Sequence, residues 1–507
     1  MGVTVTSFYF LCFLAGALLL YYVVPKKIQW CVLLLAGISY YLLSGNGVLI
    51  AYPILGCLVA WGGAYAVSKF QKPKLYLTLT VALLIGTLFV LKYVNFISNT
   101  VNAIGECFGK ESILPTTSFL VPLGISFYTF TILGYVIDVY NRISPVQTNY
   151  FKFLTFGMYF APILSGPIMK YREDGEQFFK PHYVNYHNLT FGAQRILWGF
   201  FKTIVISERT KLIADTVYNN PSSYYGIWVI FATVCYAFTL YTNFSGCMDI
   251  VIGISQMFDL ILPENFDTPF FAKTISEYWR RWHITLGVWM KEYVFYPLLR
   301  TKGFGSLQKR MKNRFGKKTG KMLTTFIAMF ILWFTVGIWH GGDWKYVIGS
   351  GLLHWLYIVL GEVLMEPVTK LLTKIHINPQ SKWLDVLRIV RTFMLACIGF
   401  VFFRANSFSD ACLLIKNTFA LGNIKELFTS QLFSMGLDWI EFVIMIVSLG
   451  VMTVVSVMST KGSVRERIAS RKLPIRWLIW YALLFYTILL GYYGPGFSTS
   501  EFIYQGF

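Results

Sequence analysis

The chain has 507 residues, of which 56% are hydrophobic and 18% aromatic, while only 13% carry a charge; its mean hydropathy is +0.56. A soluble protein carries about a quarter charged residues, so this composition excludes a soluble globular enzyme. The formal net charge of +20 first reports topology, because cytoplasmic loops of membrane proteins retain lysine and arginine. We therefore expect no nucleic-acid partner.

Apolar blocks recur along the chain, and each is long enough to cross a bilayer as a helix of roughly 17 to 25 residues. They cover 5–24, 28–45, 47–68, 75–91, 322–339, 442–459 and 477–494. The sequence therefore predicts an all-α, multi-pass membrane protein with about 11 to 13 membrane elements, some of them re-entrant. We expect one membrane domain over residues 1–507, with N-terminal spans in 1–115, a motif-bearing core in 116–411 and further spans in 412–507.

Two basic segments set the predicted orientation. Residues 302–321 contain eight basic and no acidic side chains, and residues 461–472 are also basic, so both are expected in the cytoplasm. Four candidate spans lie between the two segments, at 322–340, 345–364, 386–403 and 440–459. Four crossings return the chain to the same side. The N-terminus and the tail after 494 are then predicted to be external.

The region from 139 to 300 is harder to interpret, because charged residues such as Arg195 and Lys202 interrupt its apolar stretches. Such segments are re-entrant or buried in protein rather than in contact with lipid. Proline and glycine punctuate 121–140 and 160–173. These two segments are either broken helices that line a cavity or kinked structural helices.

Residues 241–298 combine isolated charges with apolar and aromatic side chains. Asp249 lies among apolar residues, where a carboxylate needs a partner or water. The phrase PENFDTPF (263–270) is typical of a polar loop at the surface or at a cavity rim. The phrase SEYWRRWH (276–283) suits either an ordinary membrane-interface belt or a phosphate-binding role, since it combines tryptophan with Arg280 and Arg281.

The stretch ILWFTVGIWHGGDW (331–344) ends an uncharged run in a histidine. A histidine at the end of a span is costly unless it has a use, and the two following glycines allow a ligand to approach the backbone. No GxSxG, HExxH, Walker-type or GxGxxG motif occurs, and the eight scattered cysteines include no CxxC or zinc-type spacing. His340 is therefore the candidate general base toward a hydroxyl group, although a covalent acyl-histidine remains the alternative.

Six motifs occur in an order that resembles the bacterial membrane-bound O-acyltransferase (MBOAT) family. They are GISFYTFTILGYVIDVY (124–140), LSGPIMKYRE (164–173), FSGCMDIVIG (244–253), the run from 262 to 298, GIWHGGDWKYVIGSGLLHW (337–355) and VFFRANSFSDA (401–411), and EFIYQGF (501–507) adds a seventh. The similarity is strongest to the branch of alginate O-acetylation proteins, with the D-alanyl-lipoteichoic-acid transfer proteins as relatives. The first hundred residues match only in hydrophobic character.

The resemblance implies helices around a central tunnel and an essential histidine in the WHG motif, which is His340 here. It makes His283 of WRRWH a second catalytic candidate. Asp343 stands where relatives often have another residue, and it either orients His340 or faces solvent. The remaining candidates are supporting or tunnel-lining residues, namely Asp249, Asn243, Trp282, Trp339 and Asp343, and contacts for the donor phosphate or carrier, namely Arg280, Arg281 and Lys291.

The function that the resemblance implies is O-acylation, with acetyl as the expected group, of a cell-surface polysaccharide or cell-wall polymer. The donor would be acetyl-CoA, another acyl-CoA or an acyl-carrier thioester, with no bound cofactor or metal. Expected partners are membrane lipid, an extracytoplasmic SGNH-type or single-span protein and an acyl carrier protein, at the cytoplasmic (inner) membrane. The alternatives are D-alanyl transfer to teichoic acid and, in a different class, a transporter or flippase.

Overall fold

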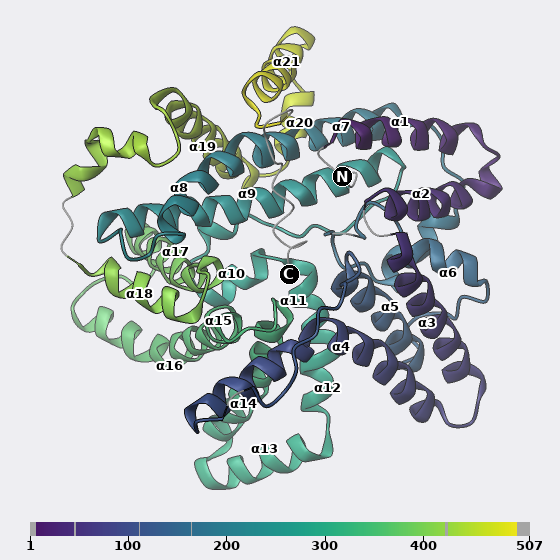
Figure 1. Ribbon diagram of the computed structural model, residues 1–507, viewed down its shortest axis with the longest axis horizontal. Coiled ribbons are helices and arrows are strands. Elements are labelled where there is room, and N and C mark those ends of the chain that lie inside the picture. The colour runs from purple at the N-terminus through teal and green to yellow at the C-terminus, as the bar shows by residue number, and fades with distance from the viewer. Residues whose placement is uncertain (1–6, 45–46, 111, 164, 421–423, 494–507) are drawn as a thin grey trace. The chain divides into compact units, whose positions relative to one another are not determined.

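The structure is a computed structural model that describes residues 7–44, 47–110, 112–163, 165–420 and 424–493. Within these ranges helices are the only regular elements (Figure 1), apart from a single bridge between Phe266 and Trp282. The all-α prediction is therefore confirmed. The motif at 501–507 and the predicted external N-terminus lie outside the described residues.

The helices are long and apolar enough for a multi-pass membrane protein. Nine described segments could each cross a membrane, namely Lys26–Ser44, Gly47–Lys69, Pro73–Cys107, Ile227–Met257, Lys317–Trp339, Trp344–Lys374, Lys382–Arg404, Trp439–Ser459 and Leu473–Leu490. Two shorter apolar helices, Phe8–Val23 and Ile125–Tyr140, bring the total in the described chain to eleven. This number lies within the predicted range.

The chain divides into two compact units. Unit 1 comprises Met1–Ile204, Asn243–Glu264 and Lys472–Phe507, and unit 2 comprises Val205–Thr242 and Asn265–Arg471. Unit 1 contains α1 (Phe8–Val23), α2 (Gln29–Ser44), α3 (Ala51–Lys69), α4 (Pro73–Cys107), α5 (Ile125–Tyr140), α6 (Tyr150–Gly157), α7 (Tyr186–Phe200) and α21 (Leu473–Leu490). The prediction of one domain over the whole chain stays a prediction.

Unit 2 holds most of the later helices. They are α8 (Glu208–Tyr218), α10 (Ile275–Arg281), α11 (Ile284–Met290), α12 (Tyr296–Leu299), α13 (Lys302–Phe315), α14 (Lys317–Trp339), α15 (Trp344–Tyr346), α16 (Leu353–Lys374), α17 (Lys382–Arg404), α18 (Phe408–Thr418), α19 (Trp439–Ser459) and α20 (Val464–Ala469). The long helix α9 (Ile227–Met257) contributes its first half to unit 2 and its second half to unit 1. Wider π-helical turns occur at η3 (Tyr171–Gly175), η5 (Phe201–Ser207), η7 (Lys291–Phe295) and η8 (Val347–Leu352).

The region that was hard to interpret from the sequence contains the most buried span. Two thirds (67%) of the most apolar window of α9 is buried inside the protein, against 6% for α21 and 17% for α19. Helix α9 therefore packs mainly against protein, while α19 and α21 present most of their surface outward, as lipid-facing helices do. The alternative of burial in protein is confirmed for this stretch.

The basic segment 302–321 is largely helical rather than a loop. Helix α13 begins at Thr301, whose hydroxyl accepts the Phe304 N–H, and Gly316 separates it from α14 with a φ of 82°. The two helices form a tight hairpin, because a β-carbon on Gly320 would lie 2.5 Å from the Lys312 backbone nitrogen. The physical reason for the correction is that α13 packs on the first turns of α14 instead of crossing open solvent.

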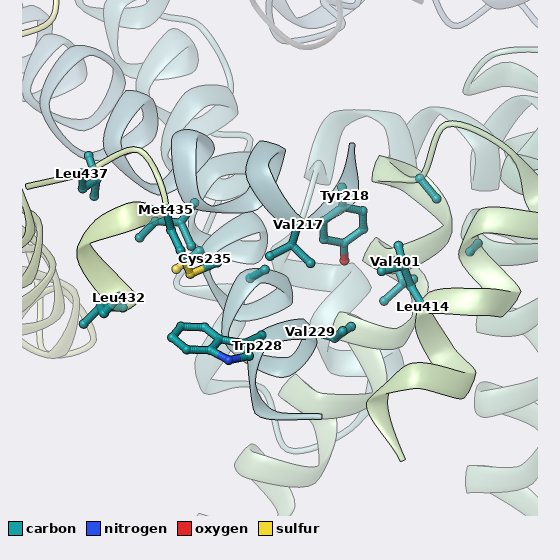
Figure 2. Packing of buried hydrophobic residues seen from close by; sticks show 14 of the residues in the cluster. Val217, Tyr218, Trp228, Val229, Cys235, Val401, Leu414, Leu432, Met435 and Leu437 are labelled. Carbon is teal, nitrogen blue, oxygen red and sulfur yellow. The ribbon is translucent and has the colours of Figure 1, made fainter. Parts of the chain in front are cut away.

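The hydrophobic core of unit 2 holds α17 in place (Figure 2). Val401 of α17 and Leu414 of α18 pack with the end of α8, the first turns of α9 and the segment around Met435. The Tyr218 hydroxyl lies 2.9 Å from the Thr233 hydroxyl inside this cluster, so its polar end is satisfied. Two residues after Val401, the same helix carries Phe403, which lines the candidate site.

Candidate active site

His340 lies at the end of the apolar helix α14. Its backbone N–H donates to the Val336 carbonyl, and its side chain is buried, with 4% of its surface exposed. The imidazole meets the Trp339 ring edge-on at a centroid distance of 5.0 Å and the Phe403 ring at 5.4 Å. Two aromatic side chains thus form walls around the ring predicted to be the base.

Close packing of glycines fixes the end of α14. A β-carbon on Gly337 would lie 2.6 Å from Val347 Cα, and one on Gly351 would lie 2.5 Å from the Trp333 carbonyl oxygen. Helix α14 and η8 therefore approach each other through bare backbone, a common arrangement between membrane helices. This contact sets the position of the turn that follows His340.

The two glycines after His340 have local structural roles. Gly342 has a φ of 61°, and a β-carbon on Gly341 would lie 2.5 Å from the Tyr346 ring. Asp343 then begins α15, and its Oδ1 accepts the Lys345 N–H at 2.8 Å. The turn accounts for both glycines without a ligand, and the described contact of Asp343 is a helix cap. Its proposed effect on His340 stays a prediction.

His283 lies in unit 2, as His340 does. It caps the start of α11 in the left-handed region (φ 48°), and its ring lies 5.7 Å from the Trp339 ring. Both predicted histidines therefore flank the predicted Trp339, which is itself buried. His283 lies outside the candidate spans, and burial lowers the pKa of its imidazole well below the ordinary value, with His340 as a further cause. The ring is therefore neutral at pH 7.

Asn265 is the residue that the sequence interpretation missed. It belongs to the phrase predicted to be a polar surface or rim loop, but the structure buries it completely. Its Oδ1 lies 3.2 Å from His283 Nδ1 and accepts the Thr285 N–H and hydroxyl, each at 3.0 Å. The segment is a loop, as predicted, but the surface position is wrong for Asn265, because these contacts draw its side chain inward. The sequence offered only one signal for this contact, an asparagine that precedes the histidine-containing motif WRRWH.

Trp282, the residue before His283, lies within an aromatic cluster. It is 2% exposed, stacks on Tyr278 at 5.6 Å and meets Phe266 edge-on at 5.0 Å. The cluster also contains Tyr241, Phe270 and Phe400. The side chain before His283 is therefore held firmly, which limits the freedom of the histidine that follows.

The three cationic donor-contact candidates lie nearer the surface. Arg280 and Lys291 are exposed, whereas Arg281 is half-buried and donates to Glu277 Oε1 at 2.6 Å. Arg281 is therefore already neutralised within α10. Their predicted role toward a phosphate or a carrier protein stays a prediction.

His354 is a third buried histidine in unit 2, but its surroundings differ. Its ring meets Trp279 edge-on at 5.0 Å and stacks with Trp333 at 6.0 Å, and a β-carbon on Gly399 would lie 2.7 Å from its Nε2. The ring therefore fills the packed space between helices, which is the ordinary structural use of a buried histidine.

Asp249 and Asn243 belong to unit 1. The Asp249 carboxylate lies 2.6 Å from Lys202 Nζ and 2.9 Å from Arg195 Nε, and Arg195 also pairs with Glu264. The expectation that this carboxylate needs a partner is confirmed. Asn243 is buried at the point where α9 enters unit 1. The roles of both residues at a tunnel stay predictions.

The described residues thus form an all-α, multi-pass membrane protein with two buried histidines on either side of one tryptophan. A family model described as "MBOAT, membrane-bound O-acyltransferase family" matches residues 141–402. The chain belongs to this family, as its motifs predicted, and it is an O-acyltransferase.

Curated relatives agree with this assignment. The chain is 28% identical to a probable alginate O-acetylase of Azotobacter vinelandii, over 82% of this chain and 78% of that protein. It is 28% identical to the peptidoglycan O-acetyltransferase of Helicobacter pylori, over 69% and 66% of the two chains. It is also 28% identical to the teichoic acid D-alanyltransferase of Bacillus subtilis, over 58% and 71%.

Proposed function

We propose that this enzyme moves an acetyl group from a cytosolic thioester across the membrane for O-acylation of a cell-surface polysaccharide or cell-wall polymer. The names of the relatives support this choice, since they describe O-acetylation of alginate and of peptidoglycan. The observation that carries the proposal is His340, a buried imidazole within the WHG motif at the end of an apolar helix. The enzyme would act in the cytoplasmic membrane, with a tunnel bringing the donor to the acceptor side.

The chemistry assigned to His340 is general base catalysis. One ring nitrogen removes the proton of the acceptor hydroxyl as its oxygen attacks the thioester carbonyl carbon. The tetrahedral intermediate collapses, the C–S bond breaks, and the departing thiolate takes the proton from the imidazolium. Proton transfer of this kind is typically worth about 10²–10⁴ in rate.

Other candidates would serve the two substrates. The exposed Arg280 and Lys291 would attract the phosphates of coenzyme A or an acidic carrier protein, while the aromatic walls of Trp339 and Phe403 exclude water from the acyl group. An extracytoplasmic SGNH-type or single-span protein would complete transfer to the polymer. Asp249 would act mainly by stabilising unit 1 through its ion pairs.

The decisive experiment compares the cell-surface polymers of strains with and without the gene by mass spectrometry. We expect ester-linked acetyl groups to disappear from one polymer in the deletion strain and to return on complementation. Unchanged acylation of every surface polymer would contradict the proposal.

The second candidate is D-alanyl transfer, which the similarity to the Bacillus subtilis enzyme favours. The same spectra separate the two candidates, because the mass and the amine of a released D-alanyl ester differ from those of acetate. A neighbouring gene pair for a carrier protein and its ligase would point to D-alanine, and a secreted SGNH-type gene to acetate.

A further inference from the structure

The contacts of Asn265 define which nitrogen of His283 carries a proton. Three donors or potential donors surround the Asn265 Oδ1 position: the Thr285 N–H, the Thr285 hydroxyl and His283 Nδ1. A side-chain amide can be turned by 180°, so the oxygen assignment must rest on an unambiguous neighbour.

The backbone of Thr285 supplies that neighbour. A main-chain N–H can only donate, and it points to this amide atom at 3.0 Å, so the atom must be the oxygen. The opposite orientation would place an NH₂ group against an N–H group. The Asn265 main chain adds a second anchor, because its carbonyl accepts the Ile284 N–H at 3.0 Å.

The state of His283 follows from this oxygen. A carbonyl oxygen only accepts hydrogen bonds, so the Nδ1 atom 3.2 Å away must carry the hydrogen. In a neutral imidazole the other nitrogen then has a lone pair. Burial keeps the ring neutral, as described above.

We propose that Asn265 is a positioning residue that holds His283 as the Nδ1–H tautomer, so that Nε2 is the hydrogen-bond acceptor of a ring that packs against Trp339. On the proposed function, this nitrogen receives the hydrogen bond of a hydroxyl next to the one that is to be acylated. The acceptor is thereby oriented while His340 removes the proton of the reacting hydroxyl. Asn265 itself touches neither substrate.

The direct test is nuclear magnetic resonance of the full chain in nanodiscs, with ¹⁵N-labelled histidine at pH 8. The chain has six histidines, and subtraction of the spectrum of His283→Gln isolates the signals of His283. We expect a protonated Nδ1 and an unprotonated Nε2. A protonated Nε2, in either the neutral or the doubly protonated ring, would overturn the proposal.

Variants of Asn265 and Thr285 provide a second test of the tautomer. Thr285→Val removes one hydroxyl from the Asn265 oxygen but leaves the contact with His283, so the tautomer should be unchanged. Asn265→Asp keeps an acceptor at the same place and should also keep the hydrogen on Nδ1. Loss of the Nδ1–H signal in Asn265→Asp would contradict the assignment.

A pH profile separates positioning from a purely structural role. His340 at the end of α14 is the titratable group that acts on His283, and Asn265→Asp adds a carboxylate to it. We expect Asn265→Asp to remain active and its acidic limb to move to higher pH, because the carboxylate stabilises the imidazolium. Asn265→Leu should lose about 10–100-fold in turnover, by analogy with the loss of a hydrogen-bond partner that orients a metal-ligating histidine. An unmoved limb in Asn265→Asp would overturn the positioning role.

The magnetic resonance spectra test the tautomer of His283, and the polymer analysis tests the proposed function, so either proposal can be contradicted without the other. If no surface polymer loses its acyl groups on deletion while His283 is found as the Nδ1–H tautomer, the proposed function falls and the tautomer assignment stands. If the polymer result holds and His283 carries its hydrogen on Nε2, only the present inference falls.

Discussion

Two buried polar clusters, one in each unit, are built in opposite ways. In unit 1, Asp249 is enclosed by the cations of Lys202 and Arg195, and each of these charges is neutralised by another. In unit 2, His283 and His340 lie among aromatic rings, and the pair shares Trp339 as a neighbour. The first cluster holds compensated charges, while the second holds imidazoles packed among aromatic rings.

This difference separates a stabilising role from a chemical one. A buried ion pair fixes its helices, because removing one partner leaves an uncompensated charge in a poorly solvating interior. A neutral imidazole in an aromatic pocket keeps a lone pair that can take up a proton. We therefore assign the chemistry to the histidine cluster of unit 2 and expect substitutions in the Asp249 cluster of unit 1 to act through folding.

The largest expected effect is that of His340→Ala on turnover. Removal of the base should lower thioester-dependent acyl transfer by about 10²–10⁴-fold, the usual contribution of general base catalysis. The measurement is acyl transfer by the purified enzyme in nanodiscs, with an equal melting temperature as the control for folding. A loss smaller than tenfold would remove His340 from the chemistry.

The next effect is that of Asp249→Ala on stability. The Lys202 ammonium would lose its ion pair in the interior of unit 1 and Arg195 would keep only Glu264, so we expect a cost of about 3–5 kcal/mol in the free energy of unfolding. Thermal unfolding in detergent measures this change. Glu264→Gln is the matched control: its side chain is 59% exposed, so its pair with Arg195 should contribute only about 0–1 kcal/mol. Equal effects of the two substitutions would contradict the comparison.

A smaller effect is expected for Gly351→Ala. The added methyl group would lie 2.5 Å from the Trp333 carbonyl oxygen, so η8 must move away from α14 at a cost of about 1–3 kcal/mol. Gly361→Ala on α16 is the control, because nothing lies within 4 Å of its β-carbon. Unfolding curves of the two variants that coincide would show that the contact between α14 and η8 is not tight.

The smallest effect is expected for Asp343→Ala. Loss of the cap on the Lys345 N–H should cost about 1 kcal/mol of stability, with turnover changed only a few-fold. Asp343→Asn should restore the cap and the stability. If Asp343→Ala instead abolished turnover in a stable protein, Asp343 would belong to the reaction together with His340.

Much of the fold could be predicted from the sequence because lipid imposes a length and a composition on each span. The predicted block 442–459 corresponds to α19 (Trp439–Ser459), and the block 477–494 to α21 (Leu473–Leu490). Helix α9 was not predicted by this composition rule, because a helix buried in protein can carry a charged residue such as Asp249 in its middle. The negative charge of Asp249 is explained by its ion pairs with Arg195 and Lys202, which come from earlier parts of the chain.

The site was predictable to the extent that single motifs mark it. Recognisable sequence motifs contain His340, His283 and Trp339, and the structure brings these three residues together. Asn265 was not recognised, because its importance rests on contacts with residues 283 to 285 that a local pattern cannot show. The glycines after His340 were assigned to a ligand, although the Tyr346 ring occupies the space beside Gly341.

The central claim is that one buried histidine of unit 2 performs the acyl transfer and that burial alone does not confer this role. The most direct measurement complements a deletion strain with His340→Ala or with His354→Leu at matched protein levels and quantifies ester-linked acyl groups on the surface polymer. We predict that His340→Ala leaves the polymer unacylated, whereas His354→Leu restores most of the acylation. Full acylation by the His340→Ala enzyme would contradict the account.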